Sequence, residues 1–231
     1  MEIRGLQKLT LLDYPGHTAC TVFSPGCNLR CPFCHNALLV EKDPDLPQIS
    51  PEELLDFLQK RQGLLDGVCF TGGEPLLQKD IAEVMRQVKD LGFQIKLDTN
   101  GFLPQRLAAL LDEGLVDMVA MDIKNSPQKY AQSAGLPLVD LSPVQESIQM
   151  LIQGNTDYEF RTTVVKELHQ PEDMLAIGHW LKGAKAYFLQ AFVDSGQLLQ
   201  TGYHGLDAQT MQEYLALVKP LLPSAQLRGV N

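Results

Sequence analysis

The sequence predicts an α/β fold in which a parallel sheet with outer helices forms a partial, TIM-like (β/α)6 barrel. Strand-like and helix-like segments alternate along the chain, and a parallel strand needs a crossover connection before it can pair with the preceding one. A complete barrel of eight units typically takes about 250 residues, whereas this chain has 231 residues and shows six such units. An incomplete, open-sided barrel is therefore expected.

The first three units are predicted from apolar periodicity and from the residues that bound each segment. The first strand is apolar and β-branched and stops at the turn-forming residues Ser24, Pro25 and Gly26. Ser50 is a suitable N-cap for a helix whose leucines recur at helical spacing. A buried strand, an amphipathic helix and another strand follow by the same criteria. The expected elements are strands 17–23, 67–71 and 92–98 and helices 51–61 and 79–91.

The last three units repeat this alternation. Gly114 can end a helix in the left-handed conformation, and Asp207 can cap the last helix. The expected elements are helices 104–113, 142–154, 171–181 and 207–222 and strands 115–123, 158–165 and 186–190. The C-terminal helix and tail, about residues 205–231, are either the last barrel helix or a docking surface.

The composition indicates a single domain over residues 1–231. Hydrophobic residues make up 45% of the chain and charged residues 20%, which allows a sizeable core. Acidic residues outnumber Lys and Arg by 28 to 19, and no basic run marks a surface for nucleic acid or anionic lipid. The first residues lack an apolar signal core, and no apolar run reaches membrane-spanning length. We expect a cytoplasmic protein that contacts neither nucleic acid nor membrane.

Three cysteines are crowded into the loop after the first strand, residues 24–36. Cys27, Cys31 and Cys34 form a C-x3-C-x2-C triplet, and an odd total of five cysteines does not suit a disulfide framework. Three thiolates leave one iron of a 4Fe-4S cluster without a protein ligand. That iron can accept the amino and carboxylate groups of S-adenosylmethionine (SAM).

A structural zinc site is the alternative for this triplet. C-x2-C pairs are common zinc ligands, and His35 or Cys20 could supply the fourth position. In that case the protein would be a non-catalytic, metal-binding interaction module. Spacing alone favours the cluster, and the other strand ends decide between the two.

Further polar residues follow the next strands, where the working residues of parallel sheets lie. The pair Gly72 and Gly73 lets a ligand approach the backbone, and Glu74 can accept a hydrogen bond from an ammonium group. Asp98 can bind both hydroxyls of a ribose. Each signal alone is equally typical of a tight turn.

Two basic residues lie at or near later strand ends. Lys124, two residues after Asp122, could hold the carboxylate of an amino acid, although a solvated lysine is the ordinary expectation. Arg161 lies within an apolar, β-branched strand, where an unpaired guanidinium would be costly. We expect Arg161 to face the barrel interior or a carboxylate.

Together these motifs resemble those of the radical SAM superfamily, specifically the activating enzymes of glycyl radical enzymes. The matching segments are the cysteine triplet with Phe33, GGEP at 72–75, LDTNG at 97–101 and MDIK at 121–124. Residues 11–36 most resemble the activating proteins of the anaerobic ribonucleoside-triphosphate reductase. The resemblance runs from about residue 5 to residue 190.

The resemblance implies that Cys27, Cys31 and Cys34 ligate a 4Fe-4S cluster and that SAM is the second cofactor. The implied cofactor-binding residues are Phe33, Gly72, Gly73, Glu74, Asp98, Thr99, Asn100, Asp122, Lys124, Arg161, Val164 and Gln190. Within this set the Gly-Gly-Glu turn would contact the methionine amino group, Lys124 its carboxylate, and Val164 or Val165 the adenine. Asp98, Thr99 and Asp122 would share a monovalent cation. Gln190 stands where the formate-lyase activating enzyme has a histidine.

The implied reaction is reductive cleavage of SAM by a cluster that a flavodoxin or ferredoxin reduces. The resulting 5′-deoxyadenosyl radical would take a hydrogen from a glycine loop of a partner, the anaerobic ribonucleoside-triphosphate reductase. No side chain is then needed as a general acid or base, and the histidines are expected as surface or packing residues, except His35 beside the cluster. Cys20 and Cys69 are expected in the core, without additional clusters. Another glycyl radical enzyme, a peptide or a small molecule such as a deazapurine precursor is the alternative substrate.

Overall fold

The computed structural model of the protein describes residues 1–194 and 196–230. Its strands follow one another in the sheet in the order of the sequence, from β1 to β8. They are β1 (Gly5–Thr10), β2 (Ala19–Ser24), β3 (Gly67–Gly72), β4 (Gln94–Thr99), β5 (Met118–Asp122), β6 (Asp157–Val164), β7 (Tyr187–Ala191) and β8 (Gln226–Arg228). β1 is antiparallel to β2, whereas β2–β3, β3–β4, β6–β7 and β7–β8 pair in parallel. The predicted α/β class with a mainly parallel sheet is confirmed.

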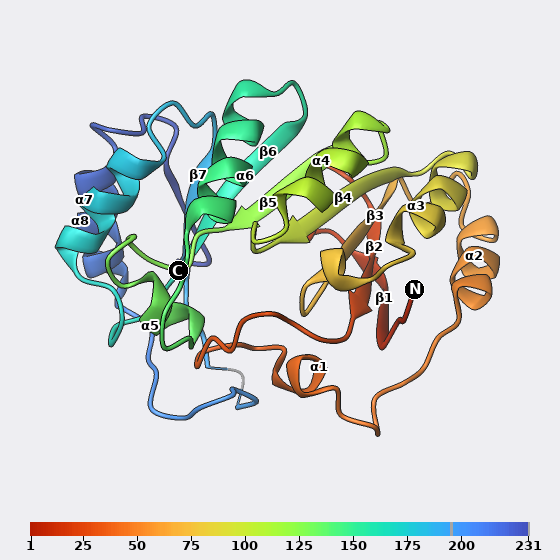
Figure 1. Cartoon of the computed structure of the whole chain (residues 1–231), viewed down its shortest axis with the longest axis horizontal. Helices are drawn as coiled ribbons and strands as arrows, with labels where there is room; N and C mark the ends of the chain where they lie inside the picture. Colours follow the sequence, from red (N-terminus) through yellow and green to blue (C-terminus); the bar gives the residue numbers. More distant parts are fainter. Residues whose placement is uncertain (195, 231) are drawn as a thin grey trace. The chain divides into compact units, whose positions relative to one another are not determined.

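The helices lie between the strands in sequence (Figure 1). They are α1 (Ala37–Glu41), α2 (Pro51–Gln59), the 3-10 turn η1 (Pro75–Leu77), α3 (Ile81–Asp90), α4 (Pro104–Asp112), α5 (Tyr130–Ala134), α6 (Ser142–Gln153), α7 (Pro171–Trp180) and α8 (Ala208–Val218). The six predicted strands correspond to β2–β7, and the six predicted helices to α2, α3, α4, α6, α7 and α8. β1 and β8 were not predicted, so the sheet is larger than the six-strand expectation. Every helix in the described part of the chain is too short or too polar to span a lipid bilayer.

The chain divides into two compact units. Unit 1 comprises Met1–Asn28, Leu38–Ala120 and Asn155–Asp157, and unit 2 comprises Leu29–Ala37, Met121–Gly154 and Tyr158–Asn231. The boundary passes through β5 and through the cysteine loop. That the whole chain acts as a single domain stays a prediction.

Unit 1 contains β1–β4 with α2, α3 and α4. The predicted N-cap of α2 is confirmed, because the Ser50 hydroxyl accepts a hydrogen bond from the Glu53 backbone N–H while the Glu53 carboxylate accepts one from the Ser50 N–H. Leu54 and Leu58 on the inner face of α2 are fully buried. Cys20 and Cys69 lie opposite each other's neighbours in β2 and β3 and are also fully buried, as predicted. This core fixes the strand ends that carry the predicted motifs.

Unit 2 contains β6, β7 and β8 with α6, α7 and α8. Helices α7 and α8 lie side by side (Figure 1). Asp207 caps α8 as predicted, its carboxylate accepting a hydrogen bond of 2.8 Å from the Thr210 N–H. The register places Gln190 of β7 opposite Thr163 of β6 on one side and Arg228 of β8 on the other. The C-terminal segment therefore supplies both a packing helix and a strand.

Candidate functional site

In unit 1 the first part of the cysteine loop packs directly on the Gly-Gly-Glu turn. The Gly73 N–H donates to the Ser24 carbonyl at 2.9 Å, and the Glu74 N–H donates to the Gly26 carbonyl at 2.8 Å. A Cβ on Gly73 would lie 1.9 Å from the Gly26 oxygen, so only glycine permits this approach. Cys27 is thereby fixed beside the end of β3.

Asn100 joins the end of β4 to the same loop. Its side-chain amide donates to the Asn28 side-chain oxygen at 2.7 Å and lies 3.8 Å from the Cys27 sulfur. Both contacts lie within unit 1. The ends of β2, β3 and β4, three separate stretches of sequence, therefore meet at Cys27.

Glu74 is fully buried, and its carboxylate is held by the protein itself. One oxygen accepts hydrogen bonds from the Thr99 hydroxyl at 2.9 Å and the Leu76 N–H at 3.1 Å. The other accepts the Asn100 N–H at 2.8 Å. Glu74 thus fixes the Thr99–Asn100 turn after β4. The sequence predicts ligand binding by Glu74, whereas its structural role depends on partners that follow the next strand and carry no sequence signal.

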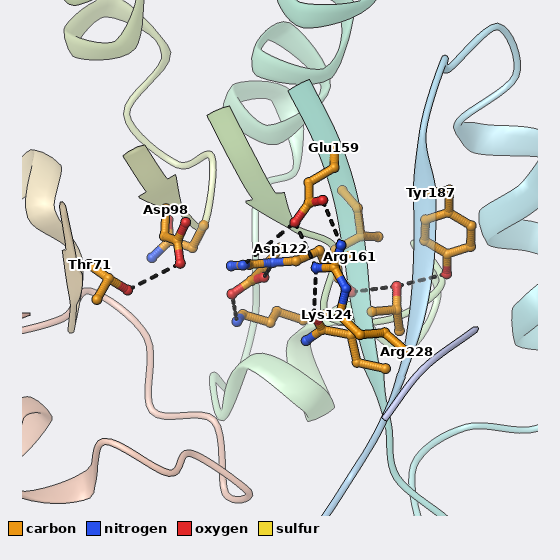
Figure 2. A network of polar contacts seen from close by, with 12 residues as sticks. Thr71, Asp98, Asp122, Lys124, Glu159, Arg161, Tyr187 and Arg228 are labelled. Atoms are coloured by element: carbon orange, nitrogen blue, oxygen red, sulfur yellow. Dashed lines mark hydrogen bonds and ion pairs between the residues drawn. The ribbon is translucent and has the colours of Figure 1, made fainter. Parts of the chain in front are cut away.

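Asp98 is paired with a buried lysine that the sequence analysis did not single out. Its carboxylate bonds to the Lys96 ammonium and accepts from the Thr71 hydroxyl at 3.4 Å, the latter contact drawn in Figure 2. Lys96 is only 1% exposed, and its nitrogen lies 3.9 Å from the Cys69 sulfur. The signal was available, since residues two apart on a strand share a face.

In unit 2 the second part of the cysteine loop is held by the segment after β7. Phe33 packs edge-on against Phe192, with ring centroids 6.4 Å apart, and His35 stacks on the same ring at 5.2 Å. The His35 Nε2 is hydrogen-bonded to the Val193 carbonyl at 2.7 Å. His35 is therefore tied to the backbone here.

The two cysteines of unit 2 are largely shielded from solvent. Cys31 is buried and Cys34 is partly buried. Burial raises the pKa of the Cys34 thiol, whereas the backbone hydrogen bond at Asn36 and the nearby Lys124 act in the opposite direction. Cys20 is a fully buried cysteine of β2 outside the triplet. Burial raises the pKa of its thiol to about 12, which keeps it protonated at neutral pH. Among the described residues, no group of three or more His, Cys, Asp or Glu side chains is placed to hold a metal ion.

Asp122, Lys124 and Arg161 form an ion-pair cluster in unit 2 (Figure 2). The Asp122 carboxylate bonds to the Lys124 ammonium at 3.0 Å and to the Arg161 Nε at 2.9 Å. Burial alone would raise the pKa of Asp122, but the Arg161 guanidinium and then the Lys124 ammonium outweigh it and hold that pKa well below its usual range. The expectation that Arg161 faces a carboxylate is confirmed.

Glu159 and Arg228 extend this cluster to the last strand (Figure 2). The Arg228 guanidinium makes two parallel hydrogen bonds of 2.8 Å to the Glu159 carboxylate, which is almost fully buried. It also donates to the Gln190 side chain at 3.3 Å and lies 3.9 Å over the Phe188 ring. This gives Gln190 a partner within the protein. Arg228 carried no sequence signal, because its partner lies 69 residues away.

His169 supports the loop that carries Lys124. It is fully buried; its Nδ1 accepts from the Val165 N–H at 3.0 Å, so Nε2 donates to the Lys124 carbonyl at 3.0 Å. Burial lowers its pKa, which keeps the ring neutral. Val164 and Val165, predicted to pack on adenine, are themselves fully buried. That contact stays a prediction.

Comparison with known proteins assigns the family. The family model of the radical SAM superfamily matches residues 21–175, about two thirds of the chain. A glycyl-radical enzyme activating enzyme of Methanocaldococcus jannaschii is 32% identical over 196 residues, covering 82% of this chain and 79% of the relative. The chain belongs to the radical SAM superfamily. This confirms the predicted family. It also confirms the prediction of an enzyme that uses a 4Fe-4S cluster and SAM as cofactors.

A second relative and a solved structure are also similar to this chain. A 7-carboxy-7-deazaguanine synthase of Thermoplasma acidophilum is 28% identical over 148 residues, covering 64% of this chain and 66% of the relative. The structure of Streptococcus suis SuiB bound to S-adenosylmethionine superposes with a TM-score of 0.69 at 13% identity, covering 90% of this chain and 52% of that chain. The chain thus spans about half of SuiB, and the likeness to it shows the shared fold.

Proposed function

We propose that this radical SAM enzyme activates a glycyl radical enzyme, and that its partner is an anaerobic ribonucleoside-triphosphate reductase. The packing of the cysteine loop on the Gly-Gly-Glu turn and Asn100 carries the SAM-cleaving part of the proposal, because it brings three of the motifs together around Cys27. The Methanocaldococcus jannaschii relative, named as an activating enzyme of this kind, supports the partner class. The resemblance of residues 11–36 to the reductase activators supports the finer assignment.

The chemistry of the three cysteine side chains suits an iron-sulfur cluster with one iron open to an exogenous ligand. Cys27, Cys31 and Cys34 supply three soft thiolates, which suit iron-sulfur chemistry and leave one position for an exogenous ligand. When bound, the cluster and SAM supply a 5′-deoxyadenosyl radical through one-electron reduction of the sulfonium. His35, bonded to Val193, and Cys20, a buried thiol, are poorly disposed to complete a zinc site instead.

The protein side chains bind, orient and shield the cofactors. We assign the methionine amino group to the backbone of Gly72 and Gly73, where the absence of side chains leaves room. Lys124 and Arg161 are largely buried, and Asp122 already holds both in place. We assign these two cations to the methionine carboxylate. Glu74 supports the site indirectly, because it holds the Thr99–Asn100 turn in place. A flavodoxin or ferredoxin as reductant and a cytoplasmic location remain predictions.

A second candidate substrate is a small molecule. The Thermoplasma acidophilum relative, a 7-carboxy-7-deazaguanine synthase, favours it. Because the motifs bind SAM and not the substrate, both candidates share the same first step. They differ in whether a protein glycine or a small molecule loses the hydrogen.

The SAM-cleaving step is tested by assaying 5′-deoxyadenosine. The protein is reconstituted anaerobically with iron and sulfide and given dithionite and SAM. We expect product from the wild type and none from Cys31→Ala. Cys20→Ala, at a fully buried cysteine in β2, serves as the matched control and retains product. A colourless, zinc-containing wild type without product would overturn the proposal in favour of the metal-binding module.

A further inference from the structure

Lys96 lies beside Asp98 in unit 1. Its ammonium is bonded to the Asp98 carboxylate, and the side chain is 1% exposed. A lysine buried so completely needs a compensating charge, and Asp98 provides it. The resemblance to the formate-lyase activating enzyme led us to expect an exchangeable monovalent cation on Asp98, Thr99 and Asp122. The structure gives each of these residues a partner within the protein.

Thr99, the neighbour of Asp98, is also hydrogen-bonded within the protein. Its hydroxyl donates to the Glu74 carboxylate at 2.9 Å and accepts the Gly101 N–H at 3.2 Å. The second Asp98 oxygen accepts from the Thr71 hydroxyl at 3.4 Å. A cation at Asp98 would have to displace these contacts and would meet the Lys96 ammonium as a like charge.

Asp122, the third expected ligand, has its own cations in unit 2. The Lys124 ammonium lies 3.0 Å from one carboxylate oxygen and the Arg161 Nε 2.9 Å from the other. Both oxygens of the carboxylate therefore face basic side chains. The residues present do not fit an exchangeable monovalent cation.

We propose that Lys96 replaces the exchangeable cation, so that this enzyme binds SAM without Na⁺ or K⁺. The ammonium neutralises Asp98 and holds it in place for the ribose, which makes Lys96 a positioning residue. The proposal rests on the proposed SAM-binding role of Asp98. Its physical advantage is that a covalently attached cation is present at every salt concentration.

The test measures SAM affinity by equilibrium dialysis with the reconstituted holoenzyme. Binding is compared in NaCl, KCl and choline chloride at equal ionic strength. We expect wild-type dissociation constants that agree within about twofold among the three salts. Binding that tightens about fivefold or more in Na⁺ or K⁺ would overturn the proposal. A wild type that binds no SAM in any salt would instead refute the proposed function.

Lys96→Met tests the role of the ammonium itself. We expect this variant to bind SAM at least about fivefold more weakly in choline and to recover part of the loss in NaCl or KCl. Lys89→Met, which removes a partly exposed lysine paired with Asp117 in the same unit, is the control and stays salt-independent. Wild-type affinity of Lys96→Met in choline would contradict the proposal. If Lys96→Met does not fold, the wild-type salt comparison decides.

Discussion

The Glu74 carboxylate of unit 1 and the Asp122, Lys124 and Arg161 side chains of unit 2 are held by different kinds of contact. In unit 1 the Glu74 carboxylate is fully buried and bonded to two backbone N–H groups and one hydroxyl. In unit 2 the Asp122, Lys124 and Arg161 side chains are held by one another, and they are 32%, 19% and 13% exposed. Backbone donors cannot change partner without local unfolding, whereas side-chain ion pairs near solvent exchange at small cost. The difference assigns a framework role to Glu74 and an adaptable, ligand-pairing role to the cluster of Asp122, Lys124 and Arg161.

The first prediction concerns the hydrogen bonds of the buried Glu74 carboxylate. Glu74→Gln should destabilise the protein by about 2–4 kcal/mol, because the amide presents donors to a site that already contains two backbone donors. Chemical denaturation measures the change. Glu83→Gln, at an exposed glutamate paired with Arg86 in the same unit, should cost less than about 0.5 kcal/mol. Equal effects of the two substitutions would refute the framework role.

The second prediction concerns the pair that connects β8 to β6. Arg228→Gln leaves the buried Glu159 carboxylate without its two-bond partner and should cost about 2–3 kcal/mol. The same variant should weaken SAM binding about tenfold if Glu159 and Arg161, 3.9 Å apart, are positioned together. The double variant Glu159→Gln/Arg228→Gln should lose less stability than the sum of the single changes. Additive losses would mean that the two residues act independently.

The third prediction separates binding from stability in unit 2. Lys124→Met should change the free energy of unfolding by less than about 1 kcal/mol, because Asp122 keeps its bond to Arg161. SAM affinity should nevertheless fall by at least about tenfold. The two measurements use equilibrium unfolding and dialysis on the same sample. A large loss of stability with unchanged affinity would contradict the ligand-pairing role assigned to this cluster.

The fourth and smallest effect is a pH dependence set by His169. Burial lowers the pKa of His169, so the ring is neutral in the native protein, while in the unfolded chain it takes up a proton near its ordinary pKa of about 6.5. The stability that depends on the neutral ring is complete above this pH and is lost as the pH falls below it. Wild type should therefore lose about 1 kcal/mol more than His169→Gln between about pH 7 and pH 5. His179→Gln, at an exposed histidine of α7, should follow the wild-type curve.

The sequence predicted those features that depend on local pattern. Strands β2–β7 and their helices carry apolar periodicity and caps such as Ser50 and Asp207, and the motifs lie at strand ends because parallel connections put them there. β1 and β8 were missed because one is an edge strand with exposed residues and the other has only three residues. Neither presents an apolar run long enough to be recognised.

The partners of the site residues could not be predicted in the same way. The Glu159–Arg228 and His169–Lys124 contacts join residues 69 and 45 positions apart and depend on the register of β6 against its neighbours. Lys96 is a partial exception, because residues two apart on a strand point to the same side, so Lys96 and Asp98 share one face of β4. Its burial still depends on how β3 and β4 pair.

If the protein is the activator proposed above, it places a radical on a glycine of the reductase, which can be measured. The reconstituted enzyme, SAM and dithionite are incubated with purified anaerobic ribonucleoside-triphosphate reductase, and the radical is quantified by electron paramagnetic resonance. We predict a reductase-bound radical whose hydrogen splitting collapses when the glycine is α-deuterated, and no radical with Cys31→Ala. Release of 5′-deoxyadenosine without any radical on the reductase would contradict the claim and direct the search to another substrate.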